Sequence, residues 1–392
     1  MLWRPHHLIG KRTSFDFMGK RKIALALSTA VNVLSLVGVF VFGLNFGIDF
    51  EGGIAIQVRV KQGIVHLDDL RSTLGGLGVG EVSLQEFGDP STALIRVQRQ
   101  EGNAQCVANA ERVLKRRAGD GWSVKPGPAG TGDVEFRAPQ ALDANAWRDA
   151  VSRVGLTLQE RQLPRGNTNV AKVDMTPDQR AEWCQQVAIK LVEDTIGNQF
   201  ELRGTESVGP KVGEELMRSG IYAVLATLAA IAIYVWFRFE WQFGVGALVA
   251  LLHDVLSTVG LFVLLRLDFS LTALAALLTI AGYSINDTVV VFDRVRENMR
   301  RYKRMGLIEL LNFSVNETLA RTLMTSGTVF VAVLALVLFG GPVLYSFSIA
   351  MLWGVIVGTY SSIWIASASL VYMNLRPEQL RPADDKAEQA KA

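Results

Sequence analysis

Six long apolar runs constrain the fold of this chain more than any other feature of its sequence. They carry almost no charge, and a helix rising about 1.5 Å per residue lets each run cross a bilayer. The runs cover residues 23–46, 221–237, 243–265, 269–292, 323–339 and 347–372. We therefore predict an α-helical polytopic membrane protein with six transmembrane helices, of which the last five lie within residues 220–375.

The basic residues predict how these helices are oriented. Lys and Arg gather before the first run, after the fourth and after the sixth, at positions 4, 11, 12, 20–22, 294, 296, 300, 301, 303, 304, 376 and 381. With six spans these three sites share one side, and the positive-inside rule makes that side cytoplasmic. Residues 1–22 and 376–392 are then a cytoplasmic N-terminus and tail. The first run exceeds a signal-peptide core and lacks a cleavage site, so we expect an uncleaved anchor.

The polar region between the first and second runs, residues 47–219, contains a tandem repeat. Residues 119–125 recur as 197–203, and residues 56–60 recur as 134–138, in both cases 78 positions later. Self-similarity at a fixed period indicates a duplicated unit. Each half alternates strand and helix patterns in the order βαββαβ, the split-βαβ or ferredoxin-like plan. We predict an α+β periplasmic region of two tandem ferredoxin-like units, residues 47–128 and 129–219, each closing its own sheet.

The two cysteines, Cys106 and Cys184, occupy equivalent positions in the two halves. An oxidising periplasm would permit a bridge between them. Each cysteine is expected on the long helix of its own unit, however, so a bridge requires those two helices to pack together. We expect two unpaired, partly buried thiols.

Other chemistry in the polar region is sparse. The chain has four His, and none lies near a cysteine, so no zinc site is expected. No nucleophile–base spacing stands out, so we expect neither catalytic residues nor an enzyme. The formal net charge of +3 comes mostly from the cytoplasmic loops, which argues against a nucleic-acid partner.

Asp287 places a carboxylate in the last third of the fourth apolar run. A charge at such a depth costs on the order of 3 kcal/mol on insertion scales, and membrane acids usually mark pathways for protons, ions or substrate. Ser284 precedes it on the same helical face, and Asn286 lies on the adjacent face. The alternative is a structural carboxylate that is permanently tied to a cation or to hydroxyl groups.

The natural cation for Asp287 is Arg321, near the start of the fifth helix. Arg321 shares a face with Thr325, which gives that helix a polar seam. A local pair with Glu317, four residues earlier, is the alternative. His253 and Asp254 are a second polar pair within the third run, where they either join the same seam or lie near a water-filled cytoplasmic mouth. In the last run, Gly354-x-x-x-Gly358 predicts close helix packing.

Several motifs, taken in order along the chain, carry a family resemblance. They are GIDFEGG at 47–53, SVGPKVGEEL at 207–216, FRFEW at 237–241, HDV at 253–255, GYSINDTVVVFDR at 282–294, ETLARTLMTS at 317–326, FGGP at 339–342 and GVIVGTYSS at 354–362. Together they closely resemble SecF, the smaller membrane subunit of the bacterial SecDF protein-export complex, over nearly the whole chain.

The resemblance implies a proton-coupled machine of the resistance–nodulation–division superfamily in the bacterial inner membrane. Its implied partners are a SecD-like subunit, the SecYEG channel and translocating unfolded polypeptides, with the proton gradient as energy source and no cofactor. The motif positions Asp287 and Arg321 imply a proton relay. From their places in the spans, we expect Ser284, Asn286, Thr325, Asp254 and His253 as supporting polar residues. SecF-like proteins usually have one ferredoxin-like unit, so the second unit is a departure. The alternatives are half of a small-molecule or lipid exporter and a non-transporting membrane scaffold.

Overall fold

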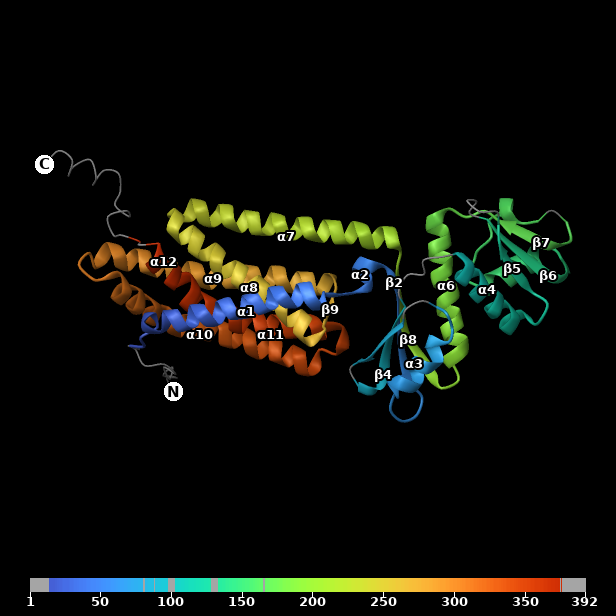
Figure 1. The fold of residues 1–392 in the computed structure, drawn as a ribbon, viewed down its shortest axis with the longest axis horizontal. Coiled ribbons are helices and arrows are strands. Elements are labelled where there is room, and N and C mark those ends of the chain that lie inside the picture. Colours follow the sequence, from blue (N-terminus) through green and yellow to red (C-terminus); the bar gives the residue numbers. More distant parts are fainter. Residues whose placement is uncertain are drawn as a thin grey trace, which may run out of the picture. The chain divides into compact units, whose positions relative to one another are not determined.

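The computed structural model describes residues 14–79, 82–87, 89–97, 103–127, 133–164, 166–373 and 375. The chain forms two compact units, one from its beginning to Asn45 together with Gly220 onward, and one from Phe46 to Ser219 (Figure 1). We call them the membrane unit and the outer unit. The basic residues Arg4, Lys11, Arg12, Arg376 and Arg381, and the expected tail at 376–392, lie outside the described residues.

Long helices build the membrane unit, and six of them are long and apolar enough to cross a bilayer, as the sequence predicts. They are α1 (Arg21–Phe42), α7 (Pro210–Arg238), α8 (Trp241–Leu265), α9 (Leu271–Arg301), α10 (Leu307–Phe339) and α11 (Tyr345–Ser361), the last continuing through a π-helical turn, η4 (Ser362–Ala366), into α12 (Ser367–Tyr372). Short elements complete the unit: η1 (Met18–Lys20), β1 (Asn45–Phe46), β9 (Asp268–Phe269) and η3 (Pro342–Leu344).

The fifth helix differs from its prediction, because α10 begins at Leu307 rather than near 323. Residues 307–322 mix polar and apolar side chains, so they do not register as an apolar run. They are helical all the same, because their apolar members pack against α9: Leu310, Leu311 and Val315 are all buried.

Helices α8, α9 and α11 form the interior of the membrane unit, whereas α1, α7 and α10 expose most of their apolar surface. Small residues on α11 allow it to pack closely against α9. A Cβ atom added to Gly354 would overlap the Ile280 side chain, and one added to Gly358 would press against Ser284. The predicted close packing at this glycine pair is therefore present, and the neighbour of α11 there is α9.

The outer unit contains two antiparallel sheets with helices packed on them. Its elements are α2 (Ile48–Glu51), β2 (Gly53–Val60), α3 (Leu67–Gly75), β3 (Val82–Phe87), β4 (Asp89–Val97), α4 (Asn103–Ala118), β5 (Ser123–Pro126), β6 (Val134–Leu142), α5 (Ala144–Ser152), η2 (Glu160–Gln162), β7 (Thr168–Val173), α6 (Pro177–Ile196) and β8 (Phe200–Val208). The strand orders are β3-β4-β2-β8 and β5-β6-β7.

The two halves of the repeat exchange their last helix and strand. Strand β8 pairs with β2, with Gly53 opposite Val208, whereas β5 pairs with β6, with Ser123 opposite Arg137. The prediction that each half closes its own sheet is therefore wrong. Strands β2 and β6 are equivalent in sequence, and so are β5 and β8, so the alternation of side chains suits either pairing.

In the first sheet, β2 and β3 run parallel with β4 between them, and β4 and β8 run parallel with β2 between them. Its fourth strand therefore comes from the second half of the repeat. The second sheet has three strands. Residues 157–160, which match strand β3 in the repeat, form no strand and lead into the turn η2. The Gln162 side chain accepts a hydrogen bond from the backbone N–H of Gln159 at 3.0 Å and holds that turn.

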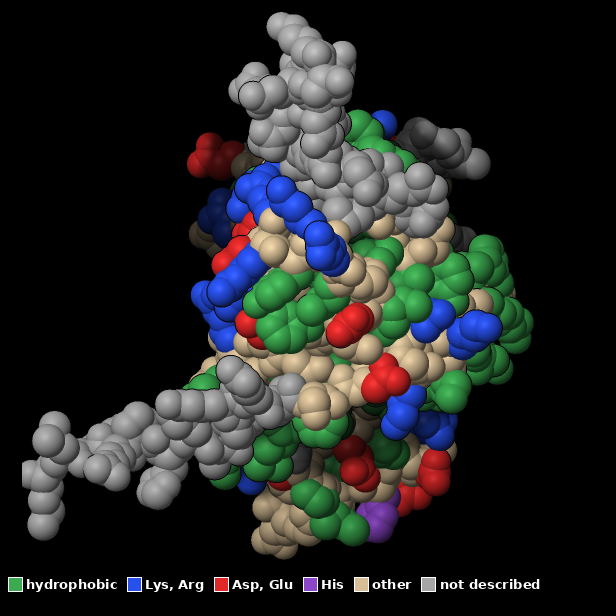
Figure 2. Space-filling view, turned by 90° about the vertical axis from the view of Figure 1, so that its left-hand side faces the viewer, with side chains coloured by type: hydrophobic (Ala, Val, Ile, Leu, Met, Phe, Trp, Pro, Cys, Tyr) green, Lys and Arg blue, Asp and Glu red, His purple; other side chains and the backbone are tan. Residues whose placement is uncertain are grey.

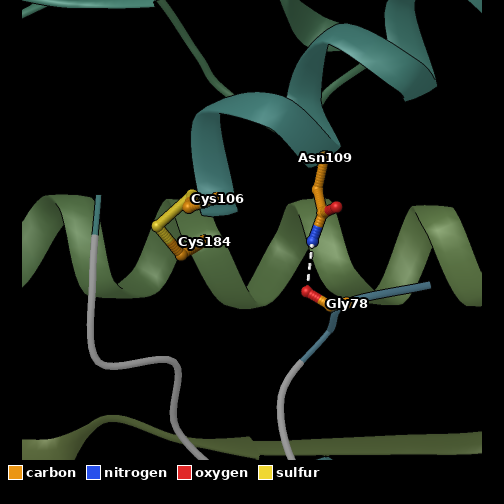
Figure 3. The surroundings of a disulfide bond; sticks show 4 residues. All are labelled: Gly78, Cys106, Asn109 and Cys184. Carbon is orange, nitrogen blue, oxygen red and sulfur yellow. Dashed lines mark hydrogen bonds between the residues drawn. A yellow bond between two sulfur atoms is a disulfide. The ribbon is translucent and has the colours of Figure 1, made fainter. Parts of the chain in front are cut away.

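A disulfide joins Cys106 on α4 to Cys184 on α6 (Figure 3). The expectation of two free thiols is wrong because the exchange brings the two long helices side by side. Farther along the same helices, the Arg117 guanidinium contacts the Asp194 carboxylate at 2.6 Å, so α4 and α6 run parallel. This carboxylate raises the pKa of Arg117. Near the disulfide, the Asn109 amide donates to the Gly78 carbonyl at 3.0 Å.

Candidate functional site

Asp287 lies within the span of α9, and only 3% of it is exposed. It belongs to the buried face of that helix, on which Leu277, Ile280, Ser284 and Val291 recur at helical spacing. The hydroxyl of Ser326 on α10 donates to Asp287 Oδ2 at 3.4 Å. The carboxylate therefore points into the bundle rather than toward lipid.

Ser326 connects three helices around this carboxylate. The Tyr283 hydroxyl on α9 donates to Ser326 Oγ at 3.0 Å, and Thr359 Oγ1 on α11 lies 2.7 Å from the same oxygen. Asn286 and Thr325, which the sequence analysis included as supporting residues, are exposed instead. The Thr325 hydroxyl donates to the backbone carbonyl of Arg321 on its own helix.

Arg321 is exposed on α10 in this single chain. Its guanidinium acts electrostatically on Asp287 but does not come within the 4.0 Å of a direct ion pair with any carboxylate in the described part of the chain. The alternative local partner, Glu317, instead accepts a hydrogen bond from Asn298 at 2.8 Å and forms an ion pair with Arg294 at 3.3 Å. The local pair is thus wrong, and a relay between Asp287 and Arg321 stays a prediction.

His253 and Asp254 lie deep in the interior on α8. Asp254 is 0% exposed, which excludes a position at a water-filled mouth. Its Oδ1 lies 2.9 Å from His253 Nδ1, and its Oδ2 accepts hydrogen bonds from the hydroxyls of Ser284 on α9 and Ser361 on α11, the latter at 2.8 Å. Ser284 is one helical turn before Asp287, so Asp254 joins the same polar seam.

Three hydroxyl residues of this seam were not predicted as site residues from the sequence: Ser326, Thr359 and Ser361. A signal was present, because Thr359 and Ser361 interrupt an apolar run just before the π-helical turn η4, and π-helical turns are frequent at functional sites. We call Asp254, His253, Ser284, Asp287, Ser326, Thr359 and Ser361 the buried polar seam.

Charged side chains gather at the end of the membrane unit that Figure 2 shows. Arg238 contacts Asp293 at 2.7 Å, and Arg296 contacts Glu240 at 3.2 Å. These pairs are partly exposed and lie beyond the seam, at one end of the membrane unit. Among the described residues, no group of three or more His, Cys, Asp or Glu could hold a metal ion.

Six helices that can span a membrane and an α/β region after the first of them define a multi-pass membrane protein, and its described interior holds two buried carboxylates. Residues 188–376 match the family model for the C-terminal part of the protein export membrane proteins SecD and SecF, and residues 37–64 match the SecD/SecF GG motif.

Relatives of similar length carry the comparison further. The protein translocase subunit SecF of Rickettsia bellii is 36% identical over 96% of this chain and 99% of its own length. That of Cereibacter sphaeroides is 38% identical over 94% and 92%. The chain therefore belongs to the SecF family of protein translocase subunits.

A solved structure agrees in fold. The crystal structure of SecDF, a translocon-associated membrane protein from Thermus thermophilus, superposes with a TM-score of 0.65 at 30% identity over 95% of this chain. The present chain spans 40% of that SecDF chain.

Proposed function

We propose that this protein is the SecF subunit of a SecDF-type complex that uses the proton-motive force to promote the passage of unfolded polypeptides through the SecYEG channel. It acts as a transport component rather than as an enzyme, and the proton gradient takes the place of a cofactor. The observation that carries the proposal is the burial of Asp287 in a hydroxyl-rich seam that joins α9, α10 and α11. An acid in that setting is suited to bind and release a proton.

Protonation of Asp287 changes what holds these helices together. The ionised carboxylate accepts from Ser326, which in turn contacts Thr359 and Tyr283. A protonated carboxyl is a weaker acceptor, so this hold on α10 and α11 loosens and the helices shift. One proton that crosses about 150 mV supplies about 3.5 kcal/mol, enough to move such an equilibrium.

The exposed position of Arg321 is evidence for a partner subunit in the membrane. A guanidinium on the lipid-facing side of a span is costly, so it is expected to meet a carboxylate or polar cavity once the complex assembles. Thr325 and Thr328 extend the same exposed polar surface. A SecD-like subunit that covers this face would complete the environment of both Arg321 and Asp287.

The proposed location is the bacterial inner membrane with both termini in the cytoplasm. The Lys and Arg residues that follow the fourth apolar run support this orientation through the positive-inside bias: 294, 296, 300, 301, 303 and 304. The disulfide supports it independently, because such bonds persist in the periplasm and are rare in the cytosol. The outer unit then faces the periplasm.

The test is proton-driven export in vesicles that contain the complex. Asp287→Asn keeps the size of the side chain but can no longer bind and release a proton, so proton-dependent export should be lost. Asp293→Asn is the matched control, since it makes the same change six residues later on α9 at the exposed rim. Export that stays fully proton-dependent in Asp287→Asn would refute the proposal.

A further inference from the structure

Asp254 is a second carboxylate in the interior of the membrane unit, and the cycle proposed above does not use it. It is 0% exposed, and three side chains hold it: His253 from its own helix, Ser284 from α9 and Ser361 from α11. His253 is itself 5% exposed. Asp254 thus sits where three helices meet and does not contact bulk solvent.

The neighbouring groups determine which protonation states of Asp254 and His253 can be buried at low cost. On α8 the neighbour is His253, on α9 it is Ser284 with Asp287 one turn farther, and on α11 it is Ser361. The Tyr360 ring lies beside the His253 ring, with centroids 6.1 Å apart. Within the described residues, His253 is the sole ion-pair partner of Asp254.

A proton count follows from these neighbours. With Nδ1 and Oδ1 2.9 Å apart, one hydrogen lies between His253 and Asp254. A neutral imidazole beside an ionised carboxylate leaves one uncompensated negative charge, which is costly to bury. The pair is uncharged as carboxylic acid plus imidazole or as carboxylate plus imidazolium. Both neutral states hold one more proton than the charged one.

Ser284 contacts this pair and lies one helical turn from Asp287. Its hydroxyl donates to Asp254, and it lies on the same buried face of α9 as Asp287, one turn earlier. Helix α11 reaches both acids, because Ser361 donates to Asp254 and Thr359 contacts the Ser326 hydroxyl that donates to Asp287. Both carboxylates are therefore connected by hydrogen bonds to the segment of α11 just before η4.

We propose that the Asp254–His253 pair is a second proton-binding site, linked to Asp287 through the Ser284 hydroxyl. In the transfer, a protonated Asp287 gives its hydrogen to Ser284 Oγ as Ser284 gives its own hydrogen to Asp254, so Asp287 is left ionised, Asp254 gains the proton and the hydroxyl is regenerated. Protonation of Asp254 weakens its hold on Ser361, as protonation of Asp287 weakens the hold of Ser326. This inference rests on the proposed proton-coupled function and deepens it.

A purely structural role is the competing account, in which Asp254 only ties three helices together. An asparagine in its place would fill the same volume and retain hydrogen bonds to both serines, since their hydroxyls can donate or accept. The structural account therefore predicts normal transport in Asp254→Asn, and the proton-binding account predicts its loss.

The experiment measures proton flux in proteoliposomes that contain the full chain with its SecD-like partner, for the native protein, Asp254→Asn and Asp287→Asn. Thr258→Val is the matched control, because it removes a buried hydroxyl one turn later on α8 that bonds only to a backbone carbonyl. We expect flux to fall about a hundredfold in Asp254→Asn, the lower range for loss of a positioned proton carrier. Thr258→Val should retain native flux.

Infrared difference spectra over a pH titration supply a readout that does not depend on Asp254→Asn folding. In Asp287→Asn, one buried carboxyl band that exchanges slowly with deuterium should remain and titrate, and His253→Gln added to that variant should shift it. Absence of any pH-dependent band, from either this carboxyl or the His253 imidazolium, overturns the inference. So does native flux with an unchanged pH profile in Asp254→Asn. If Asp287→Asn also leaves flux intact, the proposed function itself fails; if only Asp254→Asn does, this inference alone fails.

Discussion

Cys106 and Cys184, which match each other in the two halves of the repeat, are bonded to each other with their Cα atoms 5.4 Å apart. Helix α4 leads into β5 of the second sheet, and α6 leads into β8 of the first. The disulfide thus joins the two helices that the halves exchange, near the points where the chain crosses between sheets. A duplicated sequence has become one interlocked unit with a continuous core.

Removal of this disulfide should destabilise the outer unit. The bond closes a loop of 78 residues, and closing a loop of this size in the unfolded chain stabilises the fold by about 4.5 kcal/mol in the chain-entropy model. We expect the double variant Cys106→Ser, Cys184→Ser to unfold at lower urea concentration, followed by fluorescence of the buried Trp147 and Trp183. Reduction of the native protein should produce the same shift. An unchanged midpoint would show that the bond adds nothing to stability.

The stability of the outer unit should fall in acid partly through Glu111 on α4. The Lys115 ammonium donates to its carboxylate, as does the backbone N–H of Val124 at 3.2 Å, and these hydrogen bonds lower the pKa of Glu111 below its ordinary 4.5. A lowered folded-state pKa stabilises the fold above the ordinary value and loses that contribution as pH falls through the folded-state value. Urea midpoints measured from pH 7 downward should drop less steeply in Glu111→Gln. Parallel curves for the two proteins would contradict this.

Gly354→Ala should loosen the packing of α11 on α9. The added methyl group would overlap the buried Ile280, and overpacking of a tight contact costs about 1–3 kcal/mol. Gly282→Ala is the control, since nothing lies within 4 Å of the position that its Cβ would take. Thermal unfolding in detergent should be lowered for Gly354→Ala only. Equal melting temperatures in both variants would argue against a close α9–α11 contact.

Ser326→Ala should slow proton-driven transport without the complete loss expected for Asp287→Asn. The change removes the hydroxyl that donates to Asp287 and also contacts Thr359 and Tyr283. Proton flux in proteoliposomes measures the effect, with Thr279→Val as the control. The Thr279 hydroxyl is exposed and donates only to the Ala275 carbonyl of its own helix. Native flux in Ser326→Ala would place Ser326 outside the pathway.

The six spans and the inward position of Asp287 could be read from the sequence, because both rest on local periodicity. An apolar run of membrane length must satisfy its own backbone hydrogen bonds in lipid, so it forms a helix. The buried face of α9 follows from the helical spacing of Ile280, Ser284 and Asp287. The alternative ion pair between Glu317 and Arg321 is wrong because helix packing, not spacing along the chain, selects the partner. Spacing of four residues permits a pair with Arg321, but Arg294 on the neighbouring helix is the partner that the packing supplies.

The exchange of helices in the outer unit and the completion of the polar seam depended on tertiary structure alone. Equivalent strands in a duplicated sequence can pair in either combination, so no local pattern predicts that β2 takes β8. Likewise Ser361 lies 107 positions from Asp254, and only the packing of α11 against α8 brings its hydroxyl to that carboxylate. Local chemistry specified which residues are helical, extended or buried. Long-range packing selected which of them touch, because contacts between distant segments depend on the shape of the assembled core.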